Sequence, residues 1–78
     1  MNNTQLADIT VHINEKLDES ELNQLEYRLR QGNGIASIGR QRRRPHLMIV
    51  GYDPKSTKSQ KILEHVNRHG LKAQLIGL

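Results

Sequence analysis

A run of apolar residues that ends in a proline constrains the fold of this chain more than any other stretch. Residues 47–52, Leu-Met-Ile-Val-Gly-Tyr, are apolar or aromatic but for one glycine, which predicts a strand buried at the centre of a sheet. Asp53-Pro54 then ends the strand, because proline has no N–H for a sheet ladder and aspartate favours turns. Ser56 and Thr57 follow as candidate N-caps of a helix.

A strand and a helix are predicted before this run. Residues 8–14 alternate at a period of two. The residues on the core side of this strand are Ile9, Val11 and Ile13. In the helix that follows, Asp18 is the predicted N-cap and Glu21, three residues later, completes a capping box. Gly32-Asn33-Gly34 ends the helix. Its apolar stripe consists of Leu22, Leu25 and Leu29.

The second half of the chain repeats the alternation of strands and helices. Residues 35–38 are a predicted short strand, residues 39–45 an arginine-rich hairpin, and residues 71–78 a final alternating strand. The buried face of the second helix is predicted to be Ile62, Leu63 and Val66. The order βαββαβ with right-handed crossovers predicts the α+β class. It specifies a ferredoxin-like two-layer sandwich, a four-stranded antiparallel sheet with two helices on one face.

Composition restricts the kind of protein this can be. A chain of 78 residues makes one small domain, which we expect at residues 8–78 after a flexible N-terminus at residues 1–7. Because the chain has no cysteine, disulfides, thiolate metal sites and thiol catalysis are excluded. No apolar run reaches membrane-spanning length, and the polar first residues lack the basic and hydrophobic regions of a signal peptide. We therefore expect a cytoplasmic protein that does not insert into membranes.

Three segments resemble a known family. Val50-x-Tyr52-Asp53-Pro54, a helix ending in Gly70 and the closing residues 73–78 are similar to the heavy-metal-associated (HMA) domain of copper chaperones and metal-pumping ATPases. The resemblance spans roughly residues 8–78 and implies the same ferredoxin-like fold.

The metal motif of that family is absent from this chain. The family binds a soft cation through the two thiolates of Gly-Met-x-Cys-x-x-Cys, on the loop that enters the first helix. Here the cysteine positions fall on Asp18 and Glu21, and the methionine position falls on Lys16. The chain is thus similar to a member of the family without its cysteines, and we expect no Cu(I) delivery by the family's mechanism.

Metal binding through other ligands is one alternative. Asp18 and Glu21 near a helix N-terminus could hold a hard cation, which prefers oxygen ligands. His65 and His69 are spaced i, i+4, so both imidazoles share one helix face and could clamp Zn²⁺ or Cu²⁺. A structural interpretation also exists for each pair, namely the capping box and a favourable charge at a helix C-terminus. Any such metal is expected to bind weakly, and we expect no cofactor.

Nucleic-acid binding through an arginine cluster is the other alternative. Arg40, Arg42, Arg43 and Arg44 are predicted on the exposed hairpin, where they could hold the phosphates of a nucleic acid. The chain has two tyrosines and no Phe or Trp on which bases could stack. A charged edge that resists pairing with other strands is the preferred interpretation.

The sheet face opposite the helices is the remaining candidate. If alternate residues of the 47–52 strand point to the helices, as the resemblance to the HMA domain implies, their neighbours point to this open face. The predicted interaction surface consists of Leu47, Ile49, Ile76 and His12. Because no nucleophile elbow, phosphate loop or paired acid and base is present, we expect no enzyme. The preferred hypothesis is a small non-catalytic module whose partner is another protein or a second copy of itself.

Overall fold

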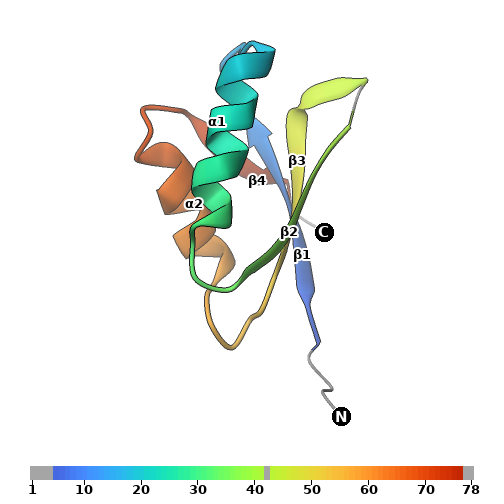
Figure 1. Cartoon of the computed structure of the whole chain (residues 1–78), viewed down its shortest axis with the longest axis vertical. Coiled ribbons are helices and arrows are strands. Elements are labelled where there is room, and N and C mark those ends of the chain that lie inside the picture. The colour runs from blue at the N-terminus through green and yellow to red at the C-terminus, as the bar shows by residue number, and fades with distance from the viewer. Residues whose placement is uncertain (1–4, 42, 77–78) are drawn as a thin grey trace.

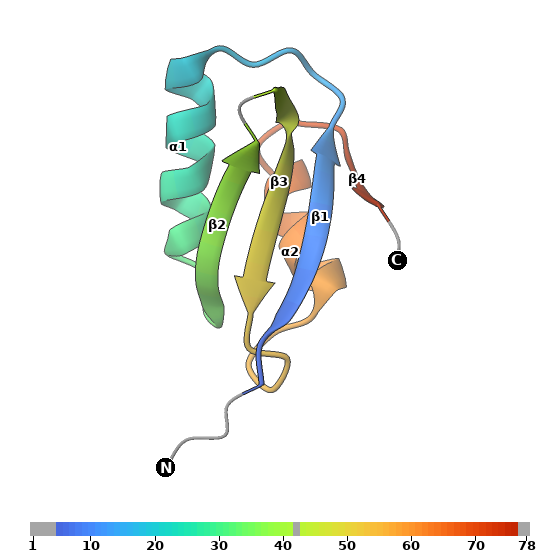
Figure 2. The same cartoon turned by 90° about the vertical axis from the view of Figure 1, so that its right-hand side faces the viewer.

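The computed structural model describes residues 5–41 and 43–76. Its elements are β1 (Ala7–Ile13), α1 (Glu19–Arg30), β2 (Ile35–Gln41), β3 (Arg44–Tyr52), α2 (Ser59–Asn67) and β4 (Ala73–Ile76). The strands form one antiparallel sheet in the order β2-β3-β1-β4. Both helices cover one face of the sheet (Figure 1), and the other face is left open (Figure 2). The predicted α+β ferredoxin-like sandwich is confirmed.

The core lies between the sheet and the two helices. β3 occupies the predicted central position, because it pairs with β2 on one side and β1 on the other. Met48, Val50 and Tyr52 of β3 point into the core, as the resemblance to the heavy-metal-associated domain implied. The buried apolar residues are Val11, Ile13, Leu22, Leu25, Leu29, Ile38, Met48, Val50, Tyr52, Ile62 and Val66.

The start of α2 differs from the prediction. The helix begins at Ser59, and its N-cap residue Lys58 makes no side-chain capping bond, so the prediction that Ser56 or Thr57 caps it is wrong. The Ser56 hydroxyl instead donates to Asp53 Oδ2 at 2.9 Å, and the Asp53 carbonyl accepts from the backbone N–H groups of both residues. Asp53 thereby extends the turn after β3 and delays the helix.

Several strand boundaries also differ, among them the start of β3, which is Arg44 and not residue 47, and the start of β4, which is Ala73 and not residue 71. β1 begins at Ala7, one residue before the predicted domain start, and β2 continues to Gln41 instead of ending at residue 38. The longer β2 forms because its backbone keeps pairing with β3 as far as Arg44, across an irregularity between Arg40 and Gln41. The predicted hairpin is consequently tighter than residues 39–45.

Candidate functional site

The start of α1 carries Asp18 at the N-cap and Glu21 in the first turn, the two residues predicted to occupy the cysteine positions. Asp18 Oδ1 accepts a hydrogen bond from the Glu21 N–H at 2.8 Å, and Glu21 Oε1 accepts one from the Asp18 N–H at 3.1 Å. The predicted capping box is therefore confirmed. A cap of this kind is worth about 1 kcal/mol, which a cation bound to these oxygens would have to offset. Metal ligation by this pair stays a prediction.

His65 of α2 and His69 lie close together but differ in their surroundings. The helix ends at Asn67, so His69 belongs to the turn that follows it and not to the helix face on which the sequence placed both histidines. The ring centroids of the two histidines are 5.3 Å apart, and Arg28 Nη1 of α1 lies 3.0 Å from His69 Nδ1. Because arginine can only donate, His69 Nδ1 accepts this bond and the proton of the neutral ring is on Nε2. In this arrangement neither ring nitrogen of His69 offers a lone pair to a metal.

The environment of His69 lowers its pKa below the ordinary value of 6.5. The causes are, in order, burial, the Arg28 guanidinium and the neighbouring His65. Its Nε2 is buried without a hydrogen-bond partner among the described residues. The folded state therefore favours the neutral imidazole.

This lowered pKa predicts acid destabilisation. Below pH 6.5 the unfolded chain protonates His69 more readily than the folded chain does, so stability falls as the pH drops toward the lowered pKa. We expect wild type to lose more stability between pH 7.5 and 5.5 than His69→Gln, whose amide keeps an acceptor for Arg28. Urea unfolding at both pH values measures this loss, and an equal loss in both proteins would contradict the prediction.

The four proposed metal ligands do not line one common cavity. Glu21 and His69 line one small cavity of about 130 Å³ together with Arg28, whereas His65 lines a different cavity. Within residues 5–41 and 43–76, no group of three or more histidine, aspartate or glutamate side chains is placed to hold a metal ion. A weak site built on His65 remains an untested prediction.

Arg40 does not belong to the exposed hairpin, and that part of the prediction is wrong. Its Nε lies 2.8 Å from Glu26 Oε2, and its Nη2 lies 3.2 Å from Glu19 Oε1 and 2.9 Å from Asn23 Oδ1, all on α1. Its side chain is 22% exposed. The reason is strand alternation, because Arg40 lies two residues after the buried Ile38 and points to the helices.

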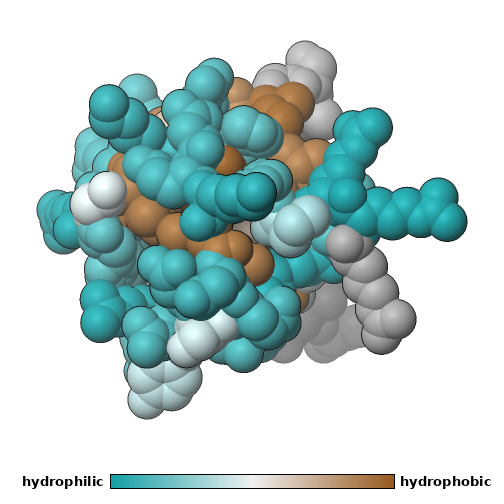
Figure 3. Space-filling view, turned by 90° about the horizontal axis from the view of Figure 1, so that it is seen from above, coloured by the Kyte–Doolittle hydropathy of each residue, from teal (hydrophilic) through white to brown (hydrophobic). Residues whose placement is uncertain are grey.

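The other hairpin arginines remain candidates for an anionic partner. Arg43 and Arg44 are exposed, and Arg42 lies outside the described residues. The end of the molecule that carries this hairpin and the start of α1 is largely hydrophilic, with a few hydrophobic residues visible between the polar ones (Figure 3). Nucleic-acid binding by this cluster is not tested by the structure.

Strand register places the four residues predicted as an interaction surface on one face of the sheet, opposite to the side on which Val11 and Met48 are buried. Thr10 of β1 pairs with Ile49 on one side and with Ile76 on the other, so the two isoleucines flank one residue. Ile49 is 38% exposed and Ile76 is 45% exposed. His12 pairs with Leu47, two residues further along each of the same strands. Strand pairing thus brings Leu47 and Ile49 of β3 and Ile76 of β4 onto one face, with Thr10 and His12 of β1 between them.

The charge on this face lies near its two ends. Asp8 and Ser37 both oppose Gly51, and a Cβ on that glycine would lie 2.5 Å from Ser37 Oγ and 3.2 Å from Asp8 Oδ1. Two charged residues, Asp8 and Lys72, belong to this face among the described residues. Asp8 opposes Gly51 near one end of the sheet, and Lys72, two residues before Gln74, accepts a hydrogen bond from the Asn14 N–H through its carbonyl near the other end. The other residues that register places here are Thr10, His12, Ser37, Gly39, Leu47, Ile49, Gly51, Gln74 and Ile76.

Comparison with known proteins defines the fold. The chain aligns with a copper binding domain from HMA7, a P-type ATPase, at 21% identity and a TM-score of 0.80, over 90% of this chain and 93% of that one. It aligns with oxidized MerP from Ralstonia metallidurans at 11% identity and a TM-score of 0.82, over 94% and 100%. It also aligns with the mercury-bound form of MerP, the periplasmic protein of the bacterial mercury detoxification system. Here the identity is 11% and the TM-score 0.75, over 94% of this chain and 100% of that one.

These likenesses show that the chain has the ferredoxin-like fold of heavy-metal-associated domains, as the resemblance in sequence implied. No family model matches the chain, and no curated protein matches it significantly. Having no cysteine, the chain lacks the Cys-x-x-Cys motif. No helix in the part of the chain that the structure describes is long and apolar enough to cross a membrane.

Proposed function

We propose that this chain is a non-catalytic, cysteine-free relative of the heavy-metal-associated domain that self-associates through the open face of its sheet. The observation that supports this most is the exposure of Ile49 and Ile76, together with the neighbouring Leu47, on the sheet face opposite the helices. The charged residues Asp8 and Lys72 lie near the two ends of this face, and exposed apolar side chains bordered by polar ones are typical of interaction surfaces.

A second copy suits this face better than a charged partner does. The net charge of +4 makes copies of the chain repel one another, unless they meet where charge is low. Gly39 and Gly51 place no side chain on this face, so a second sheet can approach closely there. Two sheets can pack about 10 Å apart, with Ile49 and Ile76 of each copy buried between them in a two-fold arrangement.

The size of the face indicates a weak complex. Four strands about 4.8 Å apart and about seven residues long at 3.4 Å each give roughly 450 Å² per copy. A standard interface buries about 800 Å² per partner. We therefore expect a dissociation constant of about 100 μM, within an order of magnitude.

Ile49→Glu should abolish this association without unfolding the domain. Its side chain already lies partly in solvent, so the fold tolerates the charge, whereas a dimer would bury two carboxylates against each other. Sedimentation equilibrium from about 10 μM to about 1 mM should show the average mass of wild type rising above 9.0 kDa and that of the variant staying there.

Tyr27→Glu is the matched control, because Tyr27 is an exposed apolar side chain on α1, 67% exposed and away from the sheet. It should dimerise like wild type. A wild type that stays monomeric at about 1 mM would refute self-association. If the circular dichroism spectrum of Ile49→Glu were that of an unfolded chain, the assignment of Ile49 to the open face would be wrong.

A further inference from the structure

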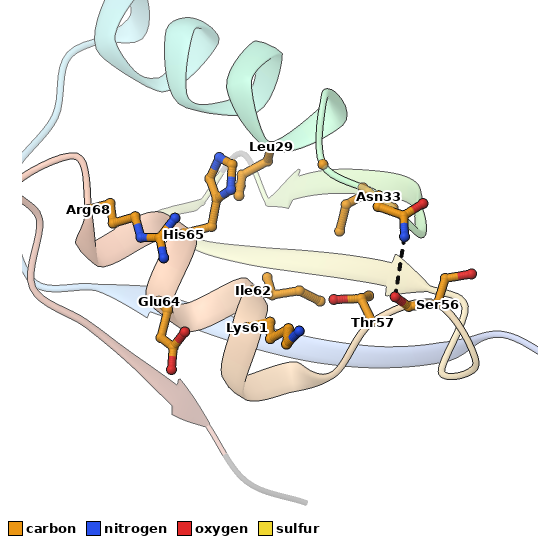
Figure 4. Close-up of a pocket in the computed structure, with 11 residues that line it drawn as sticks. Leu29, Asn33, Ser56, Thr57, Lys61, Ile62, Glu64, His65 and Arg68 are labelled. Carbon is orange, nitrogen blue, oxygen red and sulfur yellow. Dashed lines mark hydrogen bonds between the residues drawn. The ribbon is translucent and has the colours of Figure 1, made fainter.

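A concave surface lies on the helix side of the sheet, away from the proposed dimer face. It is a cavity of about 460 Å³ between the end of α1, the start of β2 and α2 (Figure 4). Its apolar lining consists of Leu29, Ile35 and Ile62. Small-molecule sites typically have volumes of this order and combine an apolar surface with a few polar groups.

Basic side chains of α2 and of its C-cap residue line one side of the cavity. Lys61, His65 and Arg68 are spaced by four and three residues, which places them along one helix face. Neither Lys61 nor Arg68 forms an ion pair with any described residue. Glu64 also lines the cavity, but its carboxylate points away from Leu29 and His65 (Figure 4). The two permanent cations are therefore available to an anion.

The opposite end of the cavity is a preformed wall made by two loops. Asn33 Nδ2 donates to the Ser56 carbonyl at 3.4 Å, and the Gly34 carbonyl accepts from the Asp53 N–H at 2.8 Å. The loops are so close that a Cβ on Gly34 would lie 2.8 Å from Ser56 Cβ. Thr57 adds a hydroxyl to the same wall. Binding here requires little ordering of the protein, which favours affinity.

We infer that this cavity binds a small organic anion, whose apolar ring or short chain contacts Leu29, Ile35 and Ile62 and whose carboxylate or phosphate faces Lys61, His65 and Arg68. A neutral apolar molecule would leave the cations without a counter-charge. An inorganic anion would leave the apolar lining in water. Only a molecule with both parts matches the two kinds of lining.

The test is a titration of the full ¹⁵N-labelled chain with phenyl phosphate, followed by amide chemical shifts. We expect saturable shifts confined to residues 33–35, 56–57 and 61–68, with a dissociation constant of about 1 mM for so small a ligand. Benzoate should behave similarly. Inorganic phosphate and phenol each retain one half of the ligand, and each should bind at least about tenfold more weakly.

Charge-removing variants test the role of the basic side chains. Lys61→Gln and Arg68→Gln should each weaken phenyl phosphate binding about threefold, since each removes one partly solvated charge contact. Arg43→Gln removes a charge from the hairpin and should change nothing. Equal affinity for phenyl phosphate and inorganic phosphate would overturn the inference, as would shifts centred on the hairpin or no saturation by about 20 mM.

Discussion

Replacing Gly34 by alanine is expected to lower the free energy of unfolding by about 2–3 kcal/mol. Gly34 has φ +83°, a left-handed conformation that costs an L-residue about 1–2 kcal/mol. In addition, the new Cβ would lie 2.8 Å from Ser56 Cβ and 3.1 Å from Thr57 Cγ2. These atoms are close to their own backbone and cannot swing aside, so the two loops must separate. Denaturant unfolding monitored by circular dichroism measures the loss.

Substitutions at two other glycines separate the conformational cost of this change from the cost of the steric contact. Gly70 has φ +78° but open space around its Cβ position, so Gly70→Ala should cost only the conformational part, about 1 kcal/mol. Gly39 has neither a positive φ nor a neighbour within 4 Å, and Gly39→Ala should be nearly neutral. Equal losses at Gly34 and Gly70 would mean that contact between the two loops contributes nothing.

Arg40→Met should destabilise the domain by about 1–2 kcal/mol. The change removes the ion pair with Glu26, whose side chains are only 22% and 16% exposed, and the more exposed pair with Glu19. Of the described residues, only Arg30, 3.9 Å away, then remains as an ion-pair partner of the poorly solvated Glu26 carboxylate. Full burial of such a pair would make the loss larger and full exposure would make it negligible, so an intermediate value follows. Methionine preserves most of the apolar stem, which isolates the charge. Urea unfolding gives the change directly.

Arg44→Met is the control, because Arg44 is an exposed arginine on the neighbouring strand. Its effect should stay within about 0.5 kcal/mol. Glu26→Gln and the double variant with Arg40→Met complete a cycle whose coupling energy reports the pair alone. If Arg40→Met and Arg44→Met were equally mild, Arg40 would belong to a freely solvated basic hairpin.

The order of elements followed from local patterns in the sequence. The apolar run at residues 47–52 and the period-two alternation at residues 8–14 predicted two strands, and the alternation also predicted which side of the first strand enters the core. Asp18 and Glu21 predicted the start of α1, because a capping box is complete within four residues. In each case the determining groups are near neighbours in the chain. The resemblance to the heavy-metal-associated domain, and not the apolar run itself, implied that Ile49 points away from the helices.

The contacts that shape the candidate sites depended on tertiary structure. Arg40 meets α1 at Glu19, 21 residues earlier, and Arg28 meets His69 across 41 residues. The cavity on the helix side forms only where the loop around Gly34 packs on the loop around Ser56. Spacing along a sequence predicts which way a side chain points from its own strand or helix. Only the packing of sheet and helices brings distant groups within hydrogen-bonding distance and determines which charges stay free for a partner.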